Sequence, residues 1–146
     1  MKMIATEMNG RSRFAELVKL QTQGRRFIDS DQERKILEDG VVRYGLTLDE
    51  AVGMLRSTTE NGSIVLEGEI GVSARQLLKT LADRRNRVAR EDFDRTVAFY
   101  KARASGGISS ADAQRRVKRM MEELDLQPKA TGRIIRSRRW YRMIEA

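Results

Sequence analysis

The distribution of proline constrains the fold of this chain more than any other feature. Its 146 residues include a single proline, Pro128, so no helix before that point is interrupted by this residue. Apolar residues recur at three- and four-residue intervals along the same stretch, as Phe14 and Val18 do, which is typical of the buried face of an amphipathic helix. The sequence therefore predicts an all-α protein, a single compact domain of five to six short helices. We expect a helical core domain over residues 1–127 and a basic aromatic C-terminal helix, docked or semi-detached, over residues 128–146.

Hydroxyl residues followed three positions later by an acid mark the expected helix starts. Ser30-Asp31-Gln32-Glu33 and Thr47-Leu48-Asp49-Glu50 have the form of a capping box, in which side chain and backbone bond reciprocally. Ser73 and Ser109 are expected to cap two further helices. A first helix is expected from Ser12 to about Arg26, and residues 63–71 suit either a short strand or an irregular helix.

Cysteine and histidine are both absent from the chain. Disulfides and thiolate nucleophiles are therefore excluded, and so are the commonest general base and the commonest transition-metal ligand. Glycine-rich phosphate-binding motifs are also missing. Glu67, Glu69 and Asp92 remain candidates for carboxylate chemistry, although Asp92 is better explained as a helix N-terminal charge. We predict no catalytic residue, no cofactor and no metal ligand.

The overall charge and the N-terminal residues bear on location and partners. The first residues, MKMIATEMNGRSR, lack the apolar core of a signal peptide, and no apolar run reaches membrane-spanning length. We therefore expect a soluble, cytoplasmic protein. Its net charge of +8 predicts attraction to polyanions without identifying which.

The C-terminal stretch gathers basic residues around the only tryptophan, Trp140. If the stretch is one helix, Ile134, Trp140, Tyr141 and Ile144 share one arc and the arginines lie on the opposite arc. Such a helix can bind phosphate, an anionic surface or an acidic protein groove, or it can dock on its own core with its arginines in water. The predicted partner-binding residues of this stretch are Arg133, Arg136, Arg138, Arg139, Trp140, Tyr141 and Arg142.

A second basic cluster surrounds residues 115–119. Lys118 and Arg119 each precede a glutamate by four residues, Glu122 and Glu123, so intrahelical pairs are expected there. Arg115 has no such downstream acid and is the eighth predicted partner-binding residue. The opposite face is expected to be core and consists of Val117, Met120, Met121 and Leu124.

Three heptapeptides share one pattern, an aliphatic residue, a small or capping residue and then an acid: residues 45–51, 87–93 and 107–113. Good helix starts converge on this pattern. The second of them also resembles the end of an EF-hand loop, with Val88 as the loop aliphatic and Asp92 as the final acid. A calcium loop needs oxygen ligands at its early positions, whereas Asp83 is followed by arginines. The resemblance implies degenerate, non-calcium-binding, EF-hand-like helix pairs used as a scaffold, similar in architecture to TerB-like all-helical domains.

These observations favour a non-catalytic accessory or regulatory binding protein that engages an acidic macromolecular partner. Another protein is the favoured partner, because the sequence contains no recognisable nucleic-acid motif. The alternative is a nucleic-acid-binding protein that contacts phosphates through its C-terminal arginines, and a carboxylate-based enzyme is a distant third hypothesis. The oligomeric state stays open.

Overall fold

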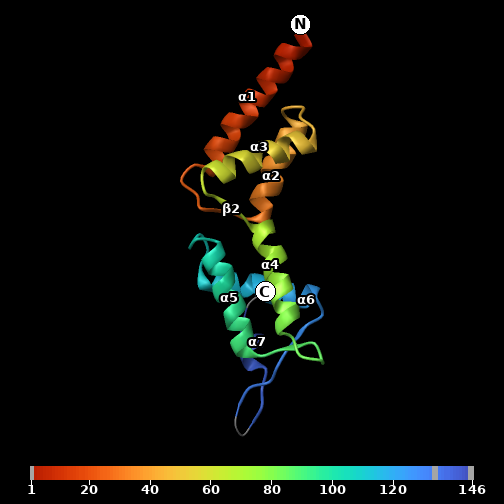
Figure 1. The fold of residues 1–146 in the computed structure, drawn as a ribbon, viewed down its shortest axis with the longest axis vertical. Coiled ribbons are helices and arrows are strands. Elements are labelled where there is room, and N and C mark those ends of the chain that lie inside the picture. The colour runs from red at the N-terminus through yellow and green to blue at the C-terminus, as the bar shows by residue number, and fades with distance from the viewer. Residues whose placement is uncertain (1, 133–134, 145–146) are drawn as a thin grey trace. The chain divides into compact units, whose positions relative to one another are not determined.

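The structure is a computed structural model that describes residues 2–132 and 135–144, with side chains from residue 9 onward. The described residues form seven helices joined by four two-residue strands (Figure 1). The prediction of a mostly helical protein is confirmed. The chain separates into two compact units, Met1–Gly68 and Glu69–Ala146, where the sequence predicted one domain. The C-terminal stretch from residue 128 lies within the second unit.

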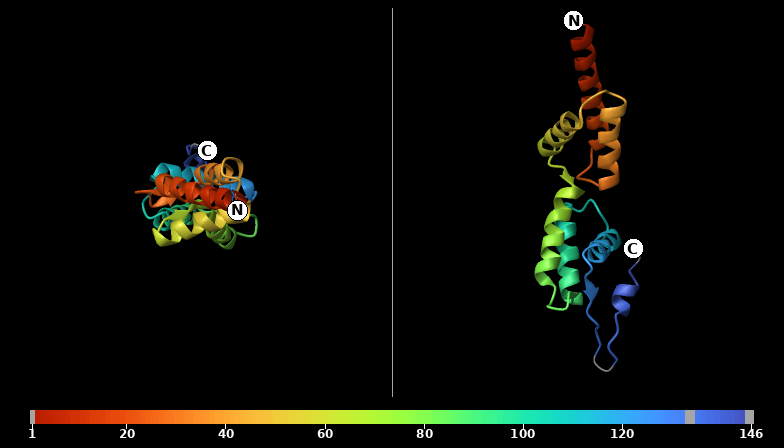
Figure 2. Two further views of the ribbon diagram at one scale, coloured as in Figure 1. Left: turned by 90° about the horizontal axis from the view of Figure 1, so that it is seen from above. Right: turned by 90° about the vertical axis from the view of Figure 1, so that its right-hand side faces the viewer.

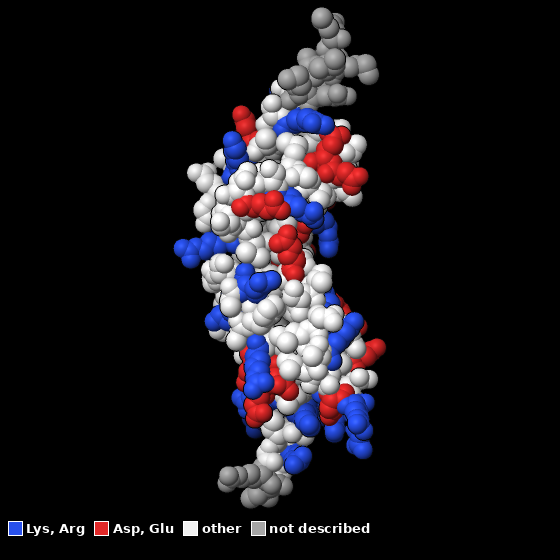
Figure 3. Space-filling view, viewed as in Figure 1, with Lys and Arg blue, Asp and Glu red and all other residues white. Residues whose placement is uncertain are grey.

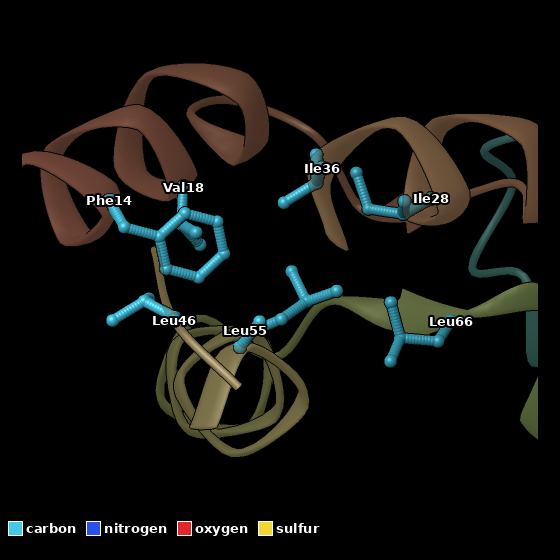
Figure 4. Packing of buried hydrophobic residues seen from close by; sticks show 8 residues of the cluster. Phe14, Val18, Ile28, Ile36, Leu46, Leu55 and Leu66 are labelled. Atoms are coloured by element: carbon cyan, nitrogen blue, oxygen red, sulfur yellow. The ribbon is translucent and has the colours of Figure 1, made fainter. Parts of the chain in front are cut away.

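Unit 1 packs three helices around one apolar core. Its elements are, in chain order, α1 (Lys2–Thr22), β1 (Phe27–Ile28), α2 (Ser30–Val42), α3 (Leu48–Asn61) and β2 (Val65–Leu66). The strands β1 and β2 run parallel, with Ile28 opposite Leu66. The buried residues of this core are Phe14, Val18, Ile28, Ile36, Leu46, Ala51, Leu55 and Leu66 (Figure 4).

Unit 2 repeats this order and adds a short last helix. Its elements are α4 (Glu67–Leu81, which begins at the boundary), β3 (Arg87–Val88), α5 (Arg90–Arg103), α6 (Ser110–Glu123), β4 (Gln127–Pro128) and α7 (Arg139–Arg142). The strands β3 and β4 again run parallel, with Val88 opposite Pro128. The predicted core face of α6 is buried at Val117, Met120 and Met121.

The two units are an internal structural repeat, in which equivalent residues lie about 60 positions apart. Ile28 in β1 corresponds to Val88 in β3, and Thr47 before α3 corresponds to Ser109 before α6. The similar heptapeptides at 45–51 and 107–113 are therefore the same helix start in the two units.

Of the four predicted helix starts, those at Thr47 and Ser109 are confirmed and the one at Ser30 is shifted by one residue. The hydroxyls of Thr47 and Ser109 both accept a hydrogen bond from the third residue of their helix, at 3.1 Å in each case. At α2 the capping residue is Asp29 rather than Ser30, and Asp29 forms its capping box with Gln32. Since β1 ends at Ile28, the helix begins directly after the strand, and aspartate caps as well as serine.

Other helix boundaries differ from the prediction. The first helix begins at Lys2 and ends at Thr22, so the buried Phe27 belongs to β1 and not to that helix. Residues 63–71 contain both a strand and a helix start, and Ser73 lies inside α4 instead of capping it. The pairing of β2 with β1 explains why α4 begins earlier than predicted, because β2 ends at Leu66 and the helix follows at the next residue.

Candidate partner-binding site

The C-terminal stretch of unit 2 is a hairpin followed by one helical turn, and the prediction of a single helix is wrong (Figure 2). Thr131 and Ser137 close the hairpin through two backbone hydrogen bonds, of 2.8 and 2.7 Å. Gly132 has a φ of +125°, and a Cβ there would lie 2.1 Å from the carbonyl oxygen of Ile135. The turn therefore requires glycine, and the arc expected of a continuous helix does not form.

The aromatic pair of this stretch packs on its own unit. The ring of Trp140 lies 5.4 Å from that of Phe93 at the start of α5, and the ring of Tyr141 lies 6.3 Å from it, both edge to face. The indole N–H of Trp140 donates to the carbonyl oxygen of Lys129 at 3.0 Å. Of the two interpretations left open, docking on its own core is the one found for Trp140 and Tyr141.

Lys118 of α6 holds the end of α7. Its ammonium group donates to the carbonyl oxygens of Ile144 at 2.7 Å and Tyr141 at 3.2 Å, and it lies 4.6 Å from the centre of the Tyr141 ring. These contacts stabilise the carbonyl end of the helix. Burial, with a smaller effect of the Glu122 charge, raises the pKa of Tyr141 to about 12.

The predicted intrahelical pairs of α6 are replaced by contacts between helices. Lys118 contacts the carbonyls of α7 as described, and Glu123 accepts from Arg75 of α4 at 3.0 and 3.2 Å. An exposed i,i+4 pair contributes only a few tenths of a kcal/mol. The side chains of Lys118 and Glu123 can therefore bind groups outside α6 in place of their partners on the same helix.

Four of the predicted arginines remain exposed and form one surface. Among the described residues, no acidic side chain forms an ion pair with Arg136, Arg138, Arg139 or Arg142. Ile135, beside them on the hairpin, is 80% exposed. We call these five residues, 135, 136, 138, 139 and 142, the C-terminal arginine surface. Arg133 lies outside the described residues.

A hollow of about 620 Å³ opens beside this surface. Its lining combines apolar and cationic side chains, among them Pro128, Ile135, Arg136, Arg138, Tyr141 and Arg142. The structure therefore brings three of the predicted arginines together with apolar surface.

Arg115 does not join this group. It pairs with Asp112, three residues before it on α6, where the sequence showed only the lack of a downstream acid. It lines a second hollow, of about 600 Å³, together with Phe93 and Trp140.

The charge of the chain is divided unevenly between the units, a signal that sequence reasoning missed. Unit 1 holds 10 basic and 11 acidic residues, a net charge of −1, whereas unit 2 holds 19 basic and 10 acidic residues, a net charge of +9. On the face shown in Figure 3, basic and acidic side chains lie interspersed over both units. The whole excess of positive charge therefore lies in the unit that carries the C-terminal arginine surface.

The loop between α4 and β3 adds to this positive charge. Arg84 and Arg85 are exposed there, and Asp83 organises the loop by accepting from the backbone N–H groups of Arg85 and Arg87, at 2.9 Å each. The Arg87 backbone N–H outweighs desolvation and, with the Arg85 N–H and the Arg87 guanidinium, holds the pKa of Asp83 below its ordinary value. Lys129, at the base of the hairpin, lies 3.7 Å from the same carboxylate.

Two of the carboxylates considered for catalysis make local contacts. Glu67 accepts from the backbone N–H of Ser30 at 2.7 Å, which ties the start of α4 to the start of α2 within unit 1. Asp92 lies in the first turn of α5, as predicted, and contacts Arg95 at 3.6 Å. In the part of the chain that the structure describes, no three acidic side chains group as they would around a metal ion.

Neither a known protein family nor a curated protein nor a solved structure matches this chain. The resemblance to EF-hand-like and TerB-like domains thus stays a prediction. None of the helices described is both long enough and apolar enough to cross a membrane.

Proposed function

We propose that this protein is a non-catalytic binding protein that engages an acidic segment of another protein through the C-terminal arginine surface. The observation that carries the proposal is one hollow lined by both cations and apolar groups. Arg136, Arg138 and Arg142 lie around it, while Pro128 and Ile135 supply apolar contact. A peptide that combines carboxylates with an apolar side chain complements both features.

Two properties of the C-terminal arginine surface favour recognition of carboxylates: its cations are guanidinium groups, and the backbone that carries them is held in place. A guanidinium binds a carboxylate through two parallel N–H···O bonds, which an ammonium group does not. The bridge between Thr131 and Ser137 and the docking of Trp140 fix the backbone that carries these arginines. A surface held in place before binding loses less conformational entropy when the partner arrives.

The positive charge of unit 2 favours the nucleic-acid alternative, but the packing of Trp140 and Tyr141 does not. A net charge of +9 on unit 2 attracts any polyanion. Proteins that bind single-stranded nucleic acids combine a positively charged groove with exposed aromatic rings on which the bases stack. Trp140 and Tyr141 already pack on Phe93, so base stacking would require α7 to leave its place. A protein partner is therefore favoured.

The test compares three probes on the full chain by calorimetry. The probes are a glutamate peptide with a central pair of leucines, polyglutamate of the same length, and a short DNA duplex. We expect the leucine-containing peptide to bind most tightly, and Ile135→Ser to abolish its advantage over polyglutamate.

The matched variants remove equal charge from two places. Glutamine at Arg136, Arg138, Arg139 and Arg142 should abolish binding, whereas glutamine at four exposed arginines of unit 1 should leave it unchanged; these are Arg13, Arg25, Arg26 and Arg56. The proposal is overturned if the duplex alone binds. A log–log salt slope of about −3.6 would then identify four phosphate contacts and a nucleic-acid partner.

A further inference from the structure

The internal repeat places a hollow at the same position in each unit. In unit 1, a mostly apolar groove of about 440 Å³ lies along α2 and the start of α3. In unit 2, the hollow of about 600 Å³ lies along α5 and α6. Glu33 and Phe93 line these two hollows from the same position, the fifth residue after Ile28 and Val88 respectively.

The two hollows differ in what covers them. In unit 2, α7 and the two residues after it lie against the hollow and contribute Trp140, Met143 and Ile144 to its lining. In unit 1, the chain runs from β2 directly into α4, so the described residues of this unit include no element that corresponds to α7. Apolar side chains consequently stay exposed in the groove, with Leu48 at 57% and Val41 at 39%. We call this the α2–α3 groove.

The charge of the α2–α3 groove indicates what it accepts. Glu33 and Glu38 line it from α2 beside Leu37 and Leu48, with Arg34 as a single cation. An acidic margin around an apolar floor complements an exposed apolar residue flanked by cations. The C-terminal arginine surface has this composition, with Ile135 among four arginines. In unit 2, moreover, the equivalent position is covered by a segment of the same C-terminal stretch.

We propose that the α2–α3 groove of one copy of this chain receives the C-terminal arginine surface of a second copy. Ile135 contacts Leu48 and Val41, and the arginines face Glu33 and Glu38. The inference rests on the proposed function, since it uses the same surface and names the acidic partner as a second copy. Each copy offers one groove and one arginine surface, so the contact is head to tail and is not limited to dimers.

Sedimentation velocity of the full chain over a range of concentrations tests the proposal. We expect oligomers that grow with concentration and dissociate in high salt, because the contact pairs opposite charges. Leu48→Asp should abolish association by placing a charge on the apolar floor. An acid in the first turn of α3 is compatible with the helix, and far-UV circular dichroism checks that folding is unchanged. Leu20→Asp, at a leucine of α1 that is 71% exposed, is the matched control and should associate like the wild type.

A mixing experiment separates the two halves of the contact. Leu48→Asp keeps its arginine surface, and the variant with glutamine at the four C-terminal arginines keeps its groove. Each should be monomeric alone, and an equimolar mixture should form a one-to-one dimer, since one intact contact remains between the two. Glu38→Gln, which leaves the apolar floor in place, should weaken wild-type association by about two- to fivefold at low salt.

The outcomes distinguish this inference from the proposed function. A wild-type chain that stays monomeric overturns the inference, and so does association that is insensitive to Leu48→Asp or a mixture that forms no dimer. If that monomeric chain still binds the leucine-containing glutamate peptide through its arginines, the proposed function stands without self-recognition. If it binds neither, both proposals fail.

Discussion

Replacing Lys118 by methionine tests how the C-terminal stretch is held. Lys118 donates to the carbonyl oxygens of Ile144 at 2.7 Å and Tyr141 at 3.2 Å, and its ammonium group lies 4.6 Å from the Tyr141 ring. Methionine keeps an unbranched apolar stem but removes the positive charge and all three contacts. The substitution should therefore weaken the docking of α7 and leave the core of α6 intact.

The size of the effect follows from these contacts. A hydrogen bond that involves a charged group contributes about 1.5–3 kcal/mol, and a cation over an aromatic ring about 0.5–1 kcal/mol at a solvated site. Lys118 is half-buried and its second hydrogen bond is long, so we count only the shorter hydrogen bond and take the lower ends of both ranges. Docking should lose about 2 kcal/mol, which raises the ratio of undocked to docked α7 by about 30-fold.

Hydrogen exchange at the indole of Trp140 measures this ratio. Trp140 is the only tryptophan, and its indole N–H is protected by the hydrogen bond to Lys129. The proton exchanges when α7 undocks, so its rate reports the undocked population. We expect exchange about 30-fold faster in Lys118→Met, and no change in the control Arg119→Met, at an exposed neighbour on the same helix. Equal rates in Lys118→Met and the wild type would refute this account of the docking.

Three further predictions concern packing and pH. Gly40→Ala should destabilise unit 1 by about 1–3 kcal/mol in urea unfolding, because a Cβ there would lie 2.9 Å from the Phe14 ring and 3.0 Å from the Ala51 Cβ. Gly53→Ala, at an open position of α3, should stabilise it by about 0.5–1 kcal/mol, and a loss of stability there would contradict the helical assignment. The Tyr141 phenol should ionise near pH 12 instead of 10. Its contribution to docking is therefore complete below pH 10 and lost as the pH rises from 10 to 12, and absorbance titration of the wild type against Tyr141→Phe should show the missing tyrosine near pH 12.

Local rules predicted the helices well where a local cause determines them. Thr47 and Ser109 cap their helices because a hydroxyl and a backbone N–H three residues apart meet whatever the tertiary context. The helical spacing of Phe93, Val97 and Tyr100 correctly identified a buried face of α5.

The C-terminal stretch shows why local rules were not sufficient for the site. The expected arc assumed a helix from residue 129 onward, but Pro128 pairs with β3 and Gly132 turns the chain back. Both features depend on partners that sequence spacing does not reveal. The sequence separated the arginines and the aromatic residues into two sets, whereas their arrangement on a hairpin and a single helical turn was not predicted.

The sequence also revealed the internal repeat only in part. The likeness of residues 45–51 and 107–113 reflects equivalent positions, but the period of about 60 residues is concealed because equivalent positions elsewhere carry different residues. Glu33 and Phe93 are such a pair, and the hidden period made two units read as one domain.

The difference between Glu33 and Phe93 accounts for much of the structural difference between the two units. A phenylalanine at this position gains free energy only if another apolar group covers it, and in unit 2 the aromatic pair of α7 does so, which leaves Phe93 1% exposed. Glutamate is far more hydrophilic than phenylalanine, and the described residues of unit 1 include no segment equivalent to α7. The same scaffold therefore presents a covered groove beside the basic C-terminal stretch in one unit and an open, acid-lined groove in the other. This asymmetry is what a head-to-tail contact between copies requires.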